Sequence, residues 1–358
     1  MIETPLAGKI RRLIEANGPI SVADYMALCL GDPALGYYRT RDPFGSAGDF
    51  VTAPEISQMF GEILGAWLIH AWRQGGSPSP VRLVELGPGR GTLMADILRV
   101  AAKVPEFLRA VSVDLIETSE ALRRRQAAAV SEARVAIEWR AALHEVPRGP
   151  LLLVANEFFD ALPVRQFMRA EGAWCERVVG LDARGRLAFG LGRGQLDGGP
   201  DAPANSVIEH RPAADALMTE IGERIAEHGG TALVVDYGYV TAAFGETLQA
   251  VRGHRFADPL ESPGETDLTA HVDFAALACA ARAAGAAAHG PMPQGEFLMA
   301  LGLVARAEKL AAGGGDAART ALAAALRRLT HPDEMGTLFK VLAVTQDGIC
   351  PPPFADWL

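Results

Sequence analysis

Hydrophobic and polar positions change their spacing along the chain, and each change predicts a different kind of element. From residue 1 to about residue 75, apolar positions recur every three or four residues, as in helices, around a glycine- and proline-rich stretch at 36–54. Four apolar runs follow, each separated from the next by a helix-like segment: VRLVEL, VSVDLIE, RVAIEW and LLLVAN. Strands that alternate with helices predict a parallel sheet that binds ligands at the carboxyl ends of its strands.

The pattern changes again after LLLVAN. Short alternating segments with turn residues between them predict an antiparallel insertion at about 163–225. The sheet resumes with TALVVDYG at 231–238, and VLAVTQDG near the C-terminus supplies a last strand. We therefore expect an α/β protein with a Rossmann-like sheet. It would have an N-terminal helical region with a long loop, 1–75, and a core, 76–358, that carries the insertion and a substrate-side loop at about 251–270.

Composition and charge narrow the class of protein. The chain has 358 residues, 49% of them hydrophobic, and a formal net charge of −9, which argues against a surface that binds nucleic acid. Its four cysteines are scattered and indicate neither a metal site nor a disulfide framework. We find no secretory signal and no run long enough to cross a membrane, so we expect a cytoplasmic protein without membrane insertion.

The stretch LVELGPGRGTLMADIL, residues 83–98, joins a strand to a helix through three alternating glycines. Gly87, Gly89 and Gly91 would let the backbone approach a ligand closely, although they could simply make a tight turn. No Gly-Lys-Ser/Thr follows, which excludes a P-loop, and the spacing departs from the dinucleotide fingerprint at its sixth position. A nicotinamide dinucleotide remains a weaker alternative.

Two acids favour a different cofactor. Glu85 lies at the end of the strand before the glycines, where it would repel a phosphate and attract a cation. S-adenosylmethionine carries a sulfonium and an ammonium and has no phosphate. Glu117, at the end of the next strand, is placed to accept hydrogen bonds from a ribose diol, although it could equally cap the helix that follows it.

A second polar segment, NEFFDALPV at 156–164, follows the fourth strand. If it turned helically, Glu157 and Asp160 would share one face and could orient a guanidinium through bidentate hydrogen bonds. One of these carboxylates could also accept the proton of the reacting nitrogen. The alternative is that Asn156 caps a helix and both acids face solvent.

These segments together resemble the MidA-like family of class I S-adenosylmethionine-dependent protein arginine methyltransferases, which act in the assembly of respiratory complex I. The resemblance spans nearly the whole chain and rests on GPISVADYMALCLGDPALGYY, GSAGDFVTAPEISQMFGEILGAWL, ELGPGRGTLMADILR, NEFFDALPVRQF, LVVDYG, GETDLTAHVDF and EMGTLFKVLA. It implies a methyltransferase core, S-adenosylmethionine as the donor, and dimethylation of an arginine in the quinone-proximal core subunit. On the resemblance, the cofactor residues are Glu85, Gly87, Gly89, Gly91 and Glu117, and the residues beside the reacting centre are Asn156, Glu157 and Asp160. Eukaryotic relatives would act in the mitochondrial matrix.

The loop GSAGDFVTAPEIS, 45–57, can then close over the cofactor, with its polar members Asp49, Thr52 and Glu55 as contacts. The alternative is an ordinary helix start, at which Asp49 or Thr52 serves as the cap, Pro54 lies in the first turn and Glu55 interacts favourably with the helix dipole. His271 and Asp273 lack a third ligand at a recognisable spacing, so we predict no metal, and a helix start is the simpler interpretation of this pair.

Two other functions stay open at this point: a complex I assembly or binding factor without turnover, and methylation of a small molecule. The many apolar helices are also compatible with a homodimer.

Overall fold

The computed structural model describes residues 4–40, 51–241 and 244–356. The chain divides into two compact units. The sheet unit comprises Val51–Phe159, Leu217–Thr241 and Val272–Leu358, and the antiparallel unit comprises Met1–Phe50, Asp160–Ala216 and Ala242–His271. Each unit has its own hydrophobic core.

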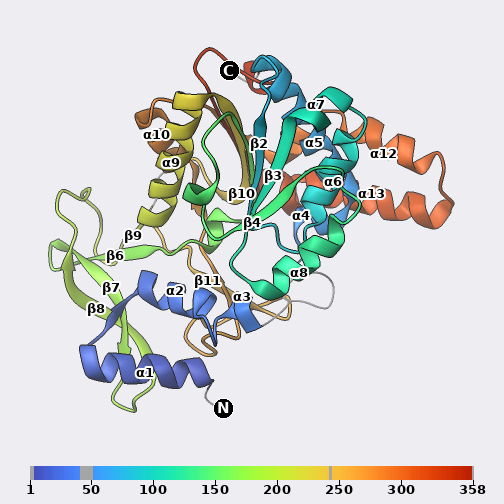
Figure 1. The fold of residues 1–358 in the computed structure, drawn as a ribbon. Coiled ribbons are helices and arrows are strands. Elements are labelled where there is room, and N and C mark those ends of the chain that lie inside the picture. The colour runs from blue at the N-terminus through green and yellow to red at the C-terminus, as the bar shows by residue number, and fades with distance from the viewer. Residues whose placement is uncertain (1–3, 41–50, 242–243, 357–358) are drawn as a thin grey trace. The chain divides into compact units, whose positions relative to one another are not determined.

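An eight-stranded sheet forms the sheet unit, in the order β15-β16-β10-β5-β2-β3-β4, with the short β14 paired to β10 (Figure 1). Strands β4, β3, β2, β5 and β10 run parallel, whereas β16 is antiparallel to β10 and β15 is antiparallel to β16. The strands are β2 Val81–Leu86, β3 Val111–Ile116, β4 Ile137–Arg140, β5 Leu151–Asn156, β10 Gly230–Tyr239, β14 Val272–Asp273, β15 Ala287–Pro293 and β16 Phe339–Thr345. The parallel α/β sheet predicted from the apolar runs is therefore confirmed, and all of β5 is buried, as expected of a central parallel strand.

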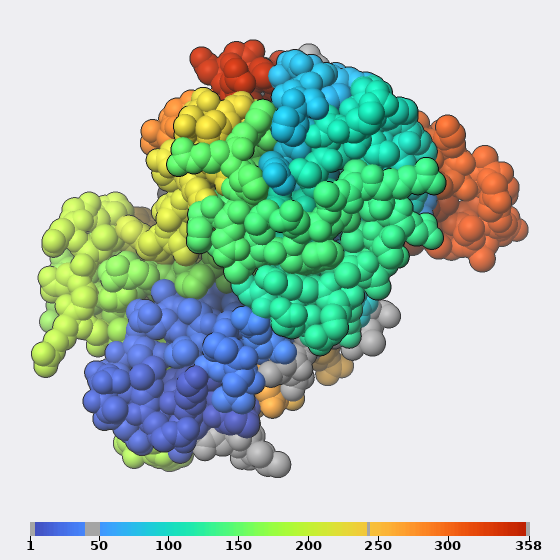
Figure 2. Space-filling model, viewed as in Figure 1, coloured from blue at the N-terminus to red at the C-terminus, as the bar shows by residue number. Residues whose placement is uncertain are grey.

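Helices cover both faces of this sheet. In Figure 1, α9 and α10 lie on one side, and α5, α6, α12 and α13 lie on the other. The helices are α4 Ala53–Ile56, α5 Gln58–Gln74, α6 Thr92–Ala101, α7 Pro105–Ala110, α8 Glu120–Ala129, α9 Pro212–His228, α10 Phe274–Ala283, α11 Gln294–Ala300, α12 Leu303–Ala311 and α13 Asp316–Thr330. Shorter turns lie at Leu143–Glu145, Pro332–Gly336 and Phe354–Asp356. Figure 2 shows α12 and α13, in orange, projecting from the surface of the unit.

In its described residues, the antiparallel unit consists of two small sheets and three helices. One sheet has the order β1-β7-β6-β9, with β8 paired to β7, and the other has the order β12-β11-β13. The strands are β1 Ile20–Ser21, β6 Arg165–Ala170, β7 Ala173–Leu181, β8 Leu187–Gln195, β9 Val207–His210, β11 Gln249–Arg252, β12 Arg255–Ala257 and β13 Asp267–Thr269. The helices are α1 Pro5–Asn17, α2 Val22–Gly31 and α3 Tyr37–Thr40, and the short turn Phe159–Ala161 begins the insertion.

This division differs from the boundary expected at residue 75. Helix α5 belongs to the sheet unit because its apolar face packs against α6, and both helices contribute to the core of that unit. Helices α1 and α2 share a core with the insertion strands. The predicted antiparallel insertion is confirmed in β6 to β9, but its last part is helix α9. In the expected substrate-side loop, the strands of the small sheet β11 to β13 alternate with turns, and residues 258–266 connect β12 to β13.

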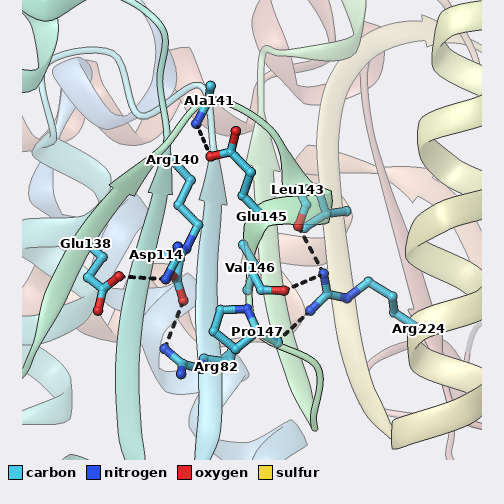
Figure 3. Close-up of polar contacts among 10 residues, drawn as sticks. All are labelled: Arg82, Asp114, Glu138, Arg140, Ala141, Leu143, Glu145, Val146, Pro147 and Arg224. Atoms are coloured by element: carbon cyan, nitrogen blue, oxygen red, sulfur yellow. Dashed lines mark hydrogen bonds and ion pairs between the residues drawn. The ribbon is translucent and has the colours of Figure 1, made fainter.

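A buried ionic cluster fixes β4 against β3 (Figure 3). Asp114, in the middle of β3, is fully buried and accepts a hydrogen bond from Arg140 Nε at 2.5 Å and one from Arg82 Nη1 at 3.4 Å. The carbonyl of Arg140 accepts the backbone N–H of Glu117 at 2.9 Å. Arg224 of α9 donates to three carbonyls of the loop after β4, those of Leu143, Val146 and Pro147 (Figure 3). The cluster therefore sets where the end of β3 lies.

Removing the buried carboxylate should cost stability. In Asp114→Ala, two guanidinium groups lose their buried partner, so we expect the free energy of unfolding to fall by about 3 kcal/mol in urea titrations. The matched control is Glu106→Ala, which removes an exposed ion pair with Arg73 and should leave the unfolding midpoint unchanged. An Asp114→Ala protein as stable as the native one would contradict the role given to this cluster.

Candidate active site

The glycine turn connects β2 to α6 with three residues in the left-handed region, since φ is 61° at Gly87, 54° at Gly89 and 87° at Gly91. A Cβ on Gly87 would lie 2.7 Å from the ring of Phe158. A Cβ on Gly91 would lie 3.0 Å from the Cα of Gln126, so this glycine is needed for helix α8 to pack against the turn. Packing of the chain against itself therefore accounts for part of the glycine pattern.

Glu85 lies near the end of β2 and is only 3% exposed. Its Oε2 is buried and has no hydrogen-bond partner among the residues that the structure describes. Loss of solvent raises the pKa of this carboxyl from 4.5 to about 8. A buried acid of this kind is costly unless a cation or a proton neutralises it.

Glu117 directly follows β3 and is held by the chain around it. Its Oε1 accepts the backbone N–H of Ser119 at 2.7 Å, and its Oε2 accepts the side-chain amide of Gln126 at 3.1 Å. The bond to Ser119 places Glu117 beside the start of α8, as the capping alternative expected. Burial raises the pKa of Glu117, although these hydrogen bonds oppose the shift.

Gln126 is a site residue that the sequence did not reveal. Its fully buried amide also donates to the carbonyl of Gly89 at 2.9 Å, and its oxygen accepts the indole N–H of Trp139 at 2.9 Å. One side chain thereby ties the glycine turn, Glu117 and strand β4 together. No sequence signal marks it, because a lone glutamine in RRRQAAA has the appearance of an ordinary surface helix residue.

Asn156 is the last residue of β5 and is 9% exposed. Its amide nitrogen donates to Glu157 Oε1 at 3.1 Å, while its Oδ1 is buried and has no hydrogen-bond partner within the described ranges of the chain. The strand register pairs Glu85 with Val154, and side chains two residues apart share a face. Glu85 and Asn156 therefore lie on the same face at the carboxyl edge of the sheet.

Glu157 has an unusual backbone for a residue with a side chain, with φ at 50°. Its N–H donates to the carbonyl of Val235 at 2.9 Å, and its Oε1 accepts the backbone N–H of Ala53 at 2.9 Å. The helical turn starts only at Phe159. The expected helical face shared by Glu157 and Asp160 is therefore absent, because the chain leaves the helical region at Glu157.

Asp236 holds this turn and was also missed from the sequence. It is fully buried in β10, and its Oδ2 accepts the N–H groups of Phe158 and Phe159 at 3.1 and 3.0 Å. Asp236 therefore caps the turn, where Asn156 was the alternative expected. An aspartate within the apolar run LVVDYG is the signal that could have identified it.

Asp160 belongs to the antiparallel unit and is 6% exposed. Its carbonyl accepts the N–H of Ala270 at 2.9 Å. Tyr38 donates its hydroxyl to Asp267 Oδ1 at 3.0 Å. Burial raises the pKa of Tyr38 well above its usual value, and the charges of Asp267 and Asp160 add to this shift. Asp160 thus lies near a second buried carboxylate within its own unit.

Of the loop residues before α5, Glu55 contacts the residues that flank the glycine turn. Asp49 lies outside the described residues. Thr52 is 9% exposed and occupies the position before α4, but its side chain makes no capping hydrogen bond. Glu55 Oε1 accepts the hydroxyl of Thr92 at 2.5 Å, and its Oε2 lies 3.8 Å from Arg90 Nη1.

Of the pair His271 and Asp273, it is Asp273 that has a structural role at the start of a helix. Asp273 caps α10 by accepting the N–H of Ala276 at 2.9 Å. Within residues 4–40, 51–241 and 244–356, no three metal-ligating side chains come together. The same ranges contain no helix long and apolar enough to span a membrane.

Comparison with known proteins agrees with this geometry. Residues 63–292 match the model of a family of S-adenosyl-L-methionine-dependent methyltransferases. A protein from Burkholderia thailandensis, solved with S-adenosylhomocysteine bound, superimposes with a TM-score of 0.84 at 30% identity, covering 97% of this chain and 95% of that one. The chain belongs to this family of S-adenosylmethionine-dependent methyltransferases.

Its relatives in other organisms define the branch of the family more closely. The human protein arginine methyltransferase NDUFAF7, described as mitochondrial, is 37% identical over 96% of this chain and 84% of its own length. The Drosophila melanogaster homologue is also 37% identical, over 95% of this chain and 84% of its own length. The resemblance noted from the motifs is therefore confirmed along nearly the whole chain.

The buried acid of β2 predicts how stability depends on pH. Between its ordinary pKa of 4.5 and its folded value of about 8, Glu85 ionises in the unfolded chain but keeps its proton in the folded one. Its contribution to stability is therefore complete below the unfolded pKa and is lost as the pH rises through about 8. Glutamine does not ionise, so the Glu85→Gln protein should not lose stability in this pH range. We expect equal unfolding free energies at about pH 4 and a gain on the order of 4 kcal/mol at about pH 9.

Urea unfolding of the cofactor-free proteins at both pH values measures this gain. A difference between Glu85→Gln and the native protein that stays the same from acid to alkaline pH would show that Glu85 is not the buried acid described here.

Proposed function

We propose that this methyltransferase modifies an arginine of a protein substrate, such as the quinone-proximal core subunit of respiratory complex I. The observation that carries the proposal is the grouping of Glu85, Asn156 and Glu157 at one edge of the sheet, beside a glycine turn. The relatives named protein arginine methyltransferase support the substrate class. The four cysteines, all in the described part of the chain and all free, support a reducing compartment, the cytoplasm in a bacterium.

The residues present fit S-adenosylmethionine. The buried Oε2 of Glu85 offers an acceptor, and the carboxyl would ionise on binding to neutralise the cationic part of the cofactor. Glu117 keeps acceptor capacity beyond its hydrogen bonds from Ser119, Gln126 and Thr118 and would bind the ribose hydroxyls. The left-handed turn at Gly87 and Gly89 would bring backbone close to the ligand, and Thr52 would add a contact from the segment before α4.

We assign Glu157 to binding the group that accepts the methyl. When bound, the cofactor supplies a methyl group already activated on a sulfonium, so the protein has mainly to position the acceptor nitrogen and exclude water. A carboxylate whose backbone and side chain are both fixed can orient a guanidinium and accept the proton that the nitrogen loses. The side-chain amide of Asn156 donates to the same oxygen of Glu157 as Ala53 does and would help to fix the direction of the carboxylate.

Asp160 is proposed as a second acid for the substrate. It follows Glu157 by three residues along the chain and lies near Asp267 in the antiparallel unit. An acid at this place in the chain would favour a cationic side chain over a neutral one, which would fit an arginine substrate.

Transfer of labelled methyl groups tests the proposal directly. The protein is incubated with labelled S-adenosylmethionine and an extract of cells that lack it, and the labelled residue is located by mass spectrometry. We expect label on an arginine of a complex I subunit. Label on a small molecule would contradict the substrate class. Retained cofactor binding with no transfer, in an extract shown to contain complex I subunits, would favour a binding factor without turnover.

Glu157→Gln should separate binding from transfer. The amide keeps an oxygen that can accept the N–H of Ala53 but cannot take a proton at neutral pH, so we expect transfer to fall by about 100-fold or more. The affinity for S-adenosylhomocysteine should stay within about threefold, as measured by calorimetry. Full transfer activity in this variant would remove Glu157 from the reaction.

A further inference from the structure

The short segment around α4 contacts the site at two points. At one point the N–H of Ala53 donates to Glu157 Oε1 at 2.9 Å. At the other, Glu55 Oε1 accepts the hydroxyl of Thr92 at 2.5 Å. Ala53 and Glu55 are two residues apart within a single helical turn, closed by the hydrogen bond from Glu55 N–H to the carbonyl of Thr52 at 2.9 Å.

The contact through Glu55 fixes the segment to the glycine turn. Thr92 is the first residue of α6 and directly follows Gly91. Arg90, on the other side of that glycine, lies 3.8 Å from Glu55 Oε2. A hydrogen bond to an ionised carboxylate is shorter and stronger than one between neutral groups. The charged end of Glu55 therefore holds both flanks of Gly91.

The contact through Ala53 orients the proposed acid. Two donors, the N–H of Ala53 and the amide of Asn156, meet at the same oxygen of Glu157. Asn156 adjoins Glu157 in sequence, whereas Ala53 reaches it from a separate segment of the sheet unit. The direction of the carboxylate thus depends on where α4 lies, and α4 is anchored through Glu55.

We propose that Glu55 is a positioning residue, which couples the glycine turn to Glu157 through the rigid turn of α4. This inference rests on the proposed role of Glu157 in methyl transfer. Pro54 stiffens the connection because its ring fixes φ within the turn. Displacing the glycine turn would displace Glu157 as well, so the cofactor-binding turn and the acid that binds the methyl acceptor are aligned with each other.

Hydrogen exchange at the amide of Ala53 tests the coupling without any substrate. In Thr92→Val the hydroxyl that binds Glu55 is absent, and we expect the Ala53 amide to exchange about tenfold faster. Thr92→Ser restores the hydroxyl and should return the rate to within about twofold of the native value. Glu157→Ala removes the acceptor and provides the rate of the uncoupled amide. Faster exchange in Glu157→Ala but not in Thr92→Val would overturn the proposal.

Methyl transfer distinguishes positioning from cofactor binding. At saturating S-adenosylmethionine, with the same cell extract as the acceptor, Thr92→Val and Glu55→Ala should each turn over about tenfold more slowly, whereas Thr92→Ser should be close to native. Their affinities for S-adenosylhomocysteine should remain within about threefold. The control Glu106→Ala, far along the chain in α7, should match the native protein in both measurements.

The outcomes separate this inference from the proposed function. Weaker cofactor binding in Thr92→Val with native turnover at saturation would mean that Glu55 serves the cofactor turn alone, and the proposal would be wrong. Full activity in Glu157→Gln would instead remove the proposed role of Glu157, while the exchange rates of Ala53 would still decide whether Glu55 controls its position.

Discussion

A buried carboxylate with no counter-charge among the described residues is the constraint on which the rest of this site depends. Glu85 lies near the end of β2, where burial raises its pKa to about 8, and no described residue forms a hydrogen bond with its Oε2. The protein on its own gains nothing from such a group, since a neutral residue of the same shape would cost less. A cationic ligand would neutralise the buried carboxylate, so the unfavourable burial would contribute to binding affinity. This is expected of a family that uses a sulfonium cofactor.

Two buried side chains hold the groups around Glu85 in place. Gln126 braces the glycine turn and Glu117 together, and Asp236 accepts the amides that follow Glu157. Both are fully buried, so their hydrogen bonds compete little with water. Such support keeps reacting groups within the small tolerances that transfer requires. The left-handed backbone of Glu157 persists because these contacts over-determine it.

Much of the fold could be predicted because each central strand is a continuous apolar run. Glycines beside an acid also identified the turn after β2. The division into units could not be predicted, because it depends on which helix packs against which sheet. Helix α5 is apolar on nearly all sides, so its sequence does not indicate which core it joins. Gln126 binds Gly89, 37 positions away, and Asp236 binds the amides of Phe158 and Phe159, 78 and 77 positions away, so no local pattern encodes these contacts. The prediction that Glu157 and Asp160 share a helical face was wrong for a related reason, because contacts with distant segments determine the backbone conformation of Glu157.

Proton release on cofactor binding tests the central claim most directly. Calorimetric titration of S-adenosylmethionine at about pH 6, in buffers of different ionisation enthalpy, counts the protons exchanged. If the cation meets Glu85, the carboxyl must ionise on binding, and about one proton should be released per cofactor bound by the native protein and none by Glu85→Gln. Binding of the native protein that releases no proton would contradict the account, because Glu85 would then be either already ionised or remote from the cofactor.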